Sequence, residues 1–197
     1  MPDRDVKTIR DLIFYQYAKI IARRVCGDSA KKTDYGFIKA AFRDLQTGAK
    51  QWSDIVREDK QFVQSDKVCI YCGSVDNLQW EHIVPKSIRI KPTCAGCEKL
   101  QGIHNMVWAC GTCNDSKGVK GLYTFFSEKY PGDKKFFDRI PALLEKKYLK
   151  TIYNCHECAG TLDSHDVNKD GVISVADIDF ILGRPHQVFG HDNQLGR

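Results

Sequence analysis

Apolar residues recur at helical spacing along the first quarter of the chain, with charged residues between them. In the range 6–25 the apolar positions are Val6, Ile9, Leu12, Ile13, Ile20, Ile21 and Val25. This period predicts an amphipathic helix. A second helix is expected from Asp34, which could serve as its N-cap, and its apolar face comprises Phe37, Ile38, Ala41, Phe42 and Leu45. A third candidate helix covers residues 52–63.

The pattern changes at Asp66, where cysteines become frequent, and it becomes helical again over residues 133–153. The apolar stripe of that later segment is Phe136, Phe137, Ile140, Leu143, Leu144 and Tyr148. Pro131 and Gly132 mark the break before it. We therefore divide the chain into a helical N-terminal region (1–65), a cysteine-rich core (66–130), a helical C-terminal region with an acidic loop (131–184) and a polar tail (185–197), which we expect to be disordered.

Composition narrows the class of protein only modestly. Of the 197 residues, 42% are hydrophobic, which supports a packed core, and the formal net charge is +5. That charge is compatible with a polyanionic partner and equally with an ordinary solvated surface. The chain has no apolar run long enough to cross a membrane, and its N-terminus lacks the uninterrupted apolar core of a signal peptide. We therefore expect a cytoplasmic protein.

Eight of the nine cysteines form four C-x-x-C pairs, and Cys26 is left over. This arrangement favours thiolate-metal ligation in a reducing compartment over a disulfide framework. The pairs Cys69/Cys72 and Cys110/Cys113, separated by 37 residues, predict a structural zinc site. A second zinc site is possible from Cys94, Cys97, Cys155 and Cys158, with His104, His156 or His165 in place of one sulfur. The alternative is that one or both of these pairs bind no metal.

Three polar elements accompany the first zinc set. Glu81-His82-Ile83-Val84-Pro85 lies between its two knuckles, Asn105 stands five residues before Cys110, and Asn114 directly follows Cys113. In order and spacing these residues resemble the HNH endonuclease family, also called ββα-metal or His-Me finger, over about residues 66–126. The resemblance implies an α+β fold with a small ββα-metal core on a four-cysteine zinc site, flanked by helices. Its strands would cover residues 79–84 and 105–109, and its helix would start near Gly111.

The resemblance also implies roles for these residues. His82 would be the general base that takes a proton from water, and Asn105 would orient it and fix its tautomer. Glu81 and Asn114 would bind Mg²⁺ or Mn²⁺ through oxygen atoms. The family usually has Asp at the position of Glu81, and Asn114 replaces the commoner His. Basic residues near the motif are plausible phosphate contacts, namely Lys86, Arg89, Lys91, Lys117 and Lys120.

An acidic loop near the C-terminus has oxygen-bearing residues at the spacing of an EF-hand. Its candidate ligands are Asp166, Asn168, Asp170, Val172 (through its carbonyl), Ser174 and Asp177, with Gly171 at the sixth position. The loop resembles that of a dockerin module and predicts a structural Ca²⁺ site. Dockerins carry two such loops, whereas this chain has one, and a metal-free acidic turn is the alternative.

These features together favour an endonuclease that hydrolyses double-stranded DNA. The compact size and helical flanks favour a site-specific, restriction-type enzyme that acts as a homodimer. A homing or mobile-element endonuclease is a second reading of the same motif. A non-catalytic, zinc-stabilised nucleic-acid-binding protein is the alternative from a different class. It would have no need for a base, an orienting amide and two oxygen ligands.

Overall fold

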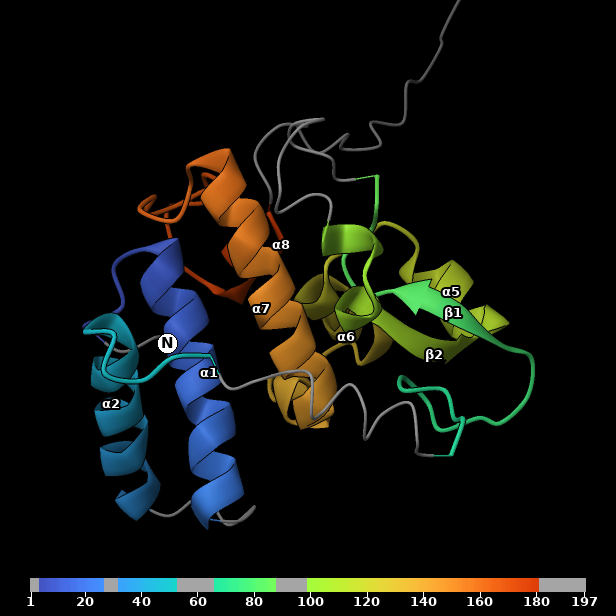
Figure 1. The fold of residues 1–197 in the computed structure, drawn as a ribbon, viewed down its shortest axis with the longest axis horizontal. Coiled ribbons are helices and arrows are strands. Elements are labelled where there is room, and N and C mark those ends of the chain that lie inside the picture. The colour runs from blue at the N-terminus through green and yellow to red at the C-terminus, as the bar shows by residue number, and fades with distance from the viewer. Residues whose placement is uncertain (1–3, 27–31, 53–65, 88–98, 181–197) are drawn as a thin grey trace, which may run out of the picture.

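The computed structural model describes residues 4–26, 32–52, 66–87 and 99–180. Its helices and strands follow one another along the chain (Figure 1). In order they are α1 (Ile9–Cys26), α2 (Lys32–Gln46), β1 (Leu78–His82), the short 3-10 helices η1 (Lys99–Gln101) and η2 (Ile103–Asn105), β2 (Met106–Cys110), α5 (Gly111–Lys117), α6 (Leu122–Lys129), the 3-10 helix η3 (Phe136–Arg139), α7 (Ala142–Ala159) and α8 (Val175–Asp179).

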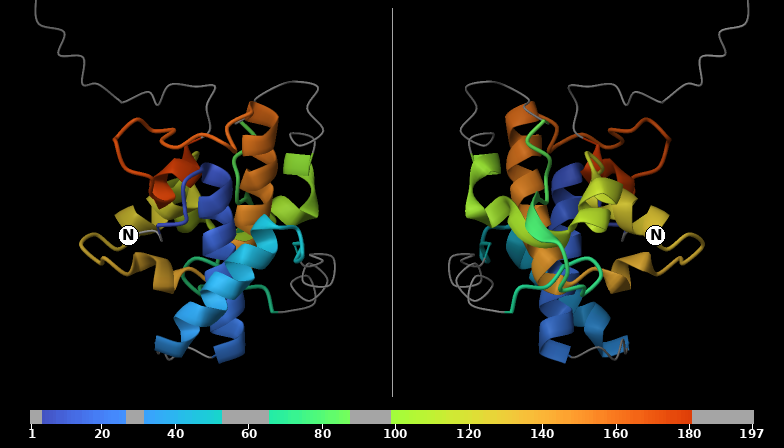
Figure 2. Two further views of the ribbon diagram at one scale, coloured as in Figure 1. Left: turned by 90° about the vertical axis from the view of Figure 1, so that its left-hand side faces the viewer. Right: turned by 90° about the vertical axis from the view of Figure 1, so that its right-hand side faces the viewer.

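Helix α7 stands between two groups of elements (Figure 1). On one side lie α1 and α2, which pack against each other, and α1 also contacts α7. On the other side lie the β1–β2 hairpin, α5 and α6. Figure 2 shows the molecule from these two sides, with α2 toward the viewer in its left view and the hairpin toward the viewer in its right view. One cluster of buried apolar side chains runs through the described residues from Val6 to Ile178. The hairpin therefore rests on a helical scaffold.

The two strands form an antiparallel pair with a single register. Leu78 pairs with Cys110 at one end and His82 with Met106 at the other. Alternation along β1 leaves Trp80 exposed and turns Glu81 into the protein. Helix α5 starts directly after β2, so its first turn lies next to the end of the hairpin. Strands and helix together form the expected small ββα unit, and the α+β fold class is confirmed.

Helix α6 receives its N-terminal cap from the other end of the chain. Asp179, the last residue of α8, accepts hydrogen bonds from the backbone N–H of Thr124 (2.6 Å) and from its hydroxyl (2.7 Å). A side chain at Gly121 would collide with this carboxylate, because an added Cβ would lie 2.1 Å from the Asp179 Cγ. Burial of the carboxylate raises the pKa of Asp179, and hydrogen bonds from Tyr148 and Thr124 oppose that rise.

Several predicted boundaries move. The segment 133–153 is not one helix, because Pro141 precedes the first turn of α7 and the earlier residues form the separate turn η3. Helix α2 begins at Lys32, ahead of Asp34. Strand β1 begins one residue and ends two residues before its expected range, and β2 is shifted by one residue toward the C-terminus. Most of the third candidate helix, the residues after Phe180 and the polar tail lie outside the described residues. Among the described helices, none is both long and apolar enough to span a membrane.

Candidate functional site

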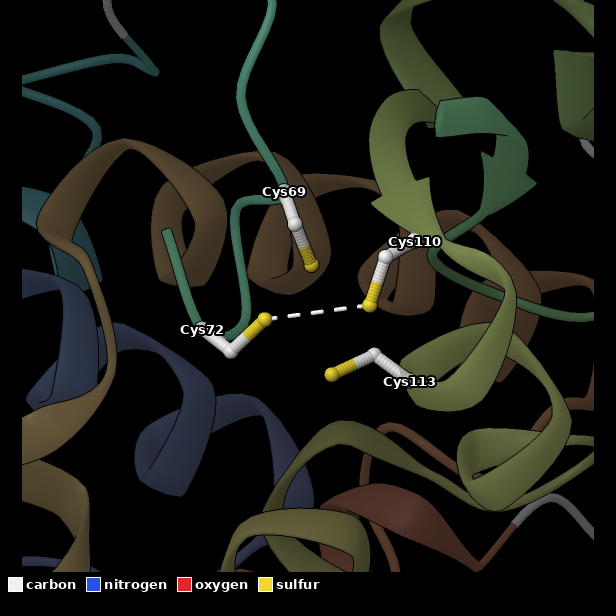
Figure 3. A group of neighbouring side chains, drawn as sticks. All are labelled: Cys69, Cys72, Cys110 and Cys113. Atoms are coloured by element: carbon white, nitrogen blue, oxygen red, sulfur yellow. Dashed lines mark hydrogen bonds between the residues drawn. The ribbon is translucent and has the colours of Figure 1, made fainter. Parts of the chain in front are cut away.

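The two first-set cysteine knuckles come from different elements and meet at one point. Cys69 and Cys72 lie in the turn before β1, Cys110 ends β2, and Cys113 lies in the first turn of α5. Figure 3 shows their four side chains directed toward a common centre. Gly73, at φ +78°, completes the first turn in a conformation that favours glycine. Its N–H bonds to the carbonyl of Cys69 at 2.7 Å.

The spacing of the sulfur atoms fits a tetrahedral metal ion. All four lie within 4.8 Å of one another, and the Sγ atoms of Cys72 and Cys110 are 3.7 Å apart. Zinc–sulfur bonds of about 2.3 Å place two tetrahedral ligands roughly 3.8 Å apart, whereas a disulfide needs about 2.05 Å. The four thiols are free in this structure. Their arrangement is compatible with structural zinc.

The charges around these thiols give a second reason for a cation. Burial raises the pKa of the Cys69 thiol, but hydrogen bonds from backbone groups of Cys110 and Tyr71 outweigh it, and the pKa falls to about 7. Burial and the neighbouring thiols Cys72 and Cys110 raise the pKa of Cys113 to about 12, although Lys129 opposes that rise. Four thiolates this close would repel one another, and a bound cation would offset that repulsion, because zinc ligates deprotonated sulfur.

Glu81 and His82 end strand β1 and occupy different environments. Glu81 is buried, whereas His82 is half-buried. Burial lowers the pKa of His82, and the positive charges of Lys86 and Lys117 lower it further. At neutral pH the imidazole is therefore uncharged, which is the form that accepts a proton.

Asn105 lies fully buried beside the loop that follows His82. Its Oδ1 accepts a hydrogen bond from the N–H of Val84, and its Nδ2 donates to the carbonyls of Val84 and Leu100, each at 2.8 Å. These bonds use both N–H groups of the amide. The structure thus gives Asn105 a task other than the expected one of fixing the tautomer of His82. It holds the backbone two residues beyond the histidine.

Lys117, expected only as a phosphate contact, is instead part of the interior. Its side chain is 0% exposed. The Nζ atom lies 2.9 Å from Oε1 of Glu81 and donates to the carbonyl of His82 at 3.3 Å. Burial lowers the pKa of Lys117, and Glu81 opposes that shift. The sequence could have indicated this position, because Lys117 lies three residues after Asn114 and residues with this spacing share one face of a helix.

Asn114 is half-buried in α5, and this helix packs against both strands of the hairpin. Because Lys117 on the same helix face reaches Glu81, Asn114 lies on the side of α5 that faces β1. Of the other basic candidates, Lys120 forms an exposed ion pair with Glu128 at 2.6 Å. Lys86 is exposed, and Arg89 and Lys91 lie outside the described residues.

The second cysteine set is only partly described. Cys155 and Cys158 stand one turn apart on α7, while Cys94 and Cys97 lie outside the described residues. Cys155 is buried and Cys158 is disulfide-bonded. A second zinc site would require the reduced form of Cys158, because the metal ligand is a thiolate. This site stays a prediction.

The histidines suggested as substitute ligands have other surroundings. Both ring nitrogens of His156 have partners, namely the Thr161 hydroxyl at 2.8 Å and the Ile178 carbonyl at 3.0 Å. His165 contacts the carbonyl of Lys7 through Nδ1 at 2.6 Å. His104 lies in η2. His156 is therefore excluded as a ligand in this conformation.

In the acidic loop, the carboxylates accept hydrogen bonds from backbone N–H groups of the loop itself. Asp166 accepts hydrogen bonds from the N–H groups of Asp170 and Gly171. Asp177 is buried, and its carboxylate accepts from the N–H groups of Val167, Asn168 and Ser174. Among the described residues, the four-cysteine cluster is the one group of ligand atoms gathered at metal-binding distance. The carboxylates of the loop are not gathered in this way, and calcium binding stays a prediction.

Removing one sulfur from the first cluster should release the metal and unfold the core. We expect at least one zinc per chain in protein purified without added metal, and loss of both zinc and fold in Cys69→Ser or Cys110→Ser. Elemental analysis with circular dichroism measures both quantities. Cys26→Ser, which changes the cysteine outside the four pairs, is the control and should keep its zinc. Less than about half an equivalent in folded parent protein would contradict the zinc assignment.

Comparison with known proteins gives one match, to a family model. A search of curated proteins and a search of solved structures each gave no significant match. Residues 69–120 match the family model described as HNH endonuclease, a range that contains the four-cysteine cluster, both strands and helix α5. The match and the cluster together support the HNH family and a nuclease-type function for this part of the chain.

Proposed function

We propose that the protein is a metal-dependent endonuclease that hydrolyses phosphodiester bonds in double-stranded DNA. The observation that carries this proposal is the end of β1, where a half-buried His82 with a lowered pKa adjoins Glu81, whose buried carboxylate pairs with Lys117 of helix α5. The family match over residues 69–120 supports the same reaction class. A protein that only bound nucleic acid would need no neutral base beside a buried carboxylate.

The residues present fit a hard divalent cation. Oε1 of Glu81 is buried and has no hydrogen bond of good geometry, so it has lone pairs to offer beyond its ion pair with Lys117. Asn114 brings an amide oxygen from the facing helix. Mg²⁺ and Mn²⁺ prefer such oxygen donors. When bound, the cation would neutralise charge on the phosphate and on the departing 3′ oxygen.

The remaining steps belong to the protein's own groups. His82 takes a proton from the attacking water, and its low pKa keeps it in the accepting form. Asn105 holds the loop after β1 at Val84, so the backbone next to the histidine is fixed before substrate arrives. Such preorganisation lowers the cost of reaching the reactive geometry.

An aromatic surface beside His82 provides a contact for the bases next to the cleaved bond. Trp80 and Trp108 are cross-strand partners whose rings stack at 4.1 Å and 27°, and Trp80 is 40% exposed. Lys67 Nζ lies 5.0 Å from the Trp108 ring. Trp80 shares a strand face with His82, two residues or about 6.8 Å along β1. Nucleic-acid surfaces commonly combine exposed rings with basic groups in this way.

The protein acts as a site-specific, restriction-type enzyme in this proposal, and two copies related by two-fold symmetry cut the two strands. A homing or mobile-element role is the alternative within the nucleases. Sequencing the ends of DNA cut by the purified protein separates the possibilities. Ends from a single short symmetric site would support the restriction role, and ends spread over unrelated sequences would remove site specificity.

Replacing His82 should stop the chemistry without removing DNA binding. We expect His82→Ala to keep its zinc and its DNA affinity and to cut at least about a hundred-fold more slowly, the usual scale for loss of a general base. Glu81→Ala and Asn114→Ala should also be slow, because each removes an oxygen ligand. Chelation should stop the parent enzyme, and added Mg²⁺ or Mn²⁺ should restore it.

The measurement is cleavage of mixed-sequence plasmid and phage DNA, with binding followed separately in EDTA. Parental cutting rates in His82→Ala would remove this residue from the mechanism. Cutting by the parent protein in EDTA would contradict the metal-dependent reaction itself.

Removing the exposed indole should weaken DNA binding. We expect Trp80→Ala to lose about 1–3 kcal/mol of DNA affinity, the scale of one aromatic–base stack, with the zinc content unchanged. Tyr35→Ala is the matched control, because Tyr35 is also an exposed ring with a lysine near it, Lys39 at 5.5 Å, but stands on α2. Fluorescence anisotropy with labelled DNA measures both. Equal affinities of the two variants would show that the Trp80–Trp108 surface does not bind DNA.

The acidic loop is proposed to hold a structural Ca²⁺ ion through the ligand set given by its spacing. Adding calcium to stripped protein should raise the thermal midpoint, because a ligand bound only by the folded state stabilises it. Asp170→Ala should abolish the response. Differential scanning fluorimetry measures it, and an unchanged midpoint in the parent protein after stripping and restoring calcium would count against the site.

A further inference from the structure

Glu81, a proposed metal ligand, is already paired with a positively charged side chain of the protein. Lys117 is the last residue of α5, is fully buried, and places Nζ 2.9 Å from Oε1 of Glu81. The carboxylate is itself only 10% exposed. A carboxylate this deeply buried requires a positive partner, since an uncompensated buried charge is strongly destabilising.

The contact between Lys117 and Glu81 is a close ion pair. Oε1 of Glu81 has no hydrogen bond of good geometry, while the Nζ atom of Lys117 donates to the carbonyl of His82 at 3.3 Å. The ammonium therefore contacts both the backbone of β1 and the carboxylate of Glu81. The lone pairs of the carboxylate stay available to a second cation.

A divalent ion and an ammonium cannot both neutralise the same carboxylate without repelling each other. Two positive charges a few ångströms apart repel strongly inside a protein, and a divalent ion doubles the effect. We propose that Lys117 supplies the charge that Glu81 needs in the metal-free protein, and that the catalytic cation binds by displacing this ammonium from the carboxylate. This inference rests on the proposed function in one respect, which is that Glu81 is a ligand of the catalytic cation.

Lys117 is thus a positioning residue that preserves the site before metal arrives and lowers the affinity for metal. Nearby Lys120 offers a contrast, because it lies three residues further on and pairs with Glu128 at the surface, both side chains being more than a third exposed. An exposed pair of this kind contributes little to stability. Lys120→Met is therefore the matched control for Lys117→Met.

The test uses zinc-loaded full-length protein without DNA, with Mn²⁺ as the probe. Lys117→Met should lower the thermal midpoint by on the order of 10 °C in the absence of Mn²⁺. Mn²⁺ should restore most of the loss and should bind at least about tenfold more tightly than to the parent protein. Calorimetric titration and thermal scans measure the two effects. Lys120→Met should match the parent in both.

The double variant Lys117→Met with Glu81→Gln separates charge from packing. Without the carboxylate there is no buried charge to compensate, so its midpoint should exceed that of Lys117→Met and should not respond to Mn²⁺. A midpoint of Lys117→Met that ignores Mn²⁺, or an Mn²⁺ affinity no tighter than that of the parent, would overturn the proposal.

A measurement on the parent protein applies even where Lys117→Met fails to fold. With ¹⁵N-labelled lysine, the Nζ resonance of Lys117 should shift as Mg²⁺ is added, and the shift should be absent in Glu81→Gln. No shift at Mg²⁺ concentrations that saturate binding would refute the exchange. Failure of the proposed nuclease activity would appear only in the cleavage assay, so the two failures are distinguishable.

Discussion

The meeting of four cysteine sulfurs is the constraint on which the rest of this structure depends. It joins the turn before β1 to the end of β2 and the start of α5. A two-stranded hairpin of this length is marginal by itself in water, so a clamp at its base fixes the strand register. Because α5 starts within the clamp, the same contact places this helix against the strands. The position of Lys117 beside Glu81 follows from it.

Several buried polar side chains around the hairpin form hydrogen bonds with backbone groups. Asn105 fixes the loop after His82, and Lys147 of α7 donates to the carbonyls of Ile103 and Met106. Buried polar groups of this kind are costly unless satisfied, and once satisfied they select one conformation. The catalytic candidates are thus positioned by main-chain bonds around them. These bonds keep the backbone around the small hairpin in one conformation.

The elements outside the family match also support the hairpin. Helix α7 lies between the hairpin and the α1–α2 pair, and its Lys147 reaches η2 and β2. Asp179 reaches back from the C-terminal segment to cap α6, which follows α5 directly. The C-terminal segment is therefore coupled to the nuclease-like core through a buried carboxylate.

The sequence alone determined the features that depend on local spacing. Two C-x-x-C turns predicted the four cysteines that meet at one point. The order of Glu81, His82, Asn105 and Asn114 predicted the hairpin and the helix that follows it, and indicated a nuclease-type function. The helical period of apolar residues located α1 and α2. The later segment, 133–153, was expected to be helical throughout, but α7 begins only after Pro141. Only the tertiary structure showed that Lys117 is buried against Glu81, that Asn105 bonds to backbone, and that Asp179 caps α6. Those contacts join residues far apart in the chain, and their geometry arises from packing, which local spacing does not encode.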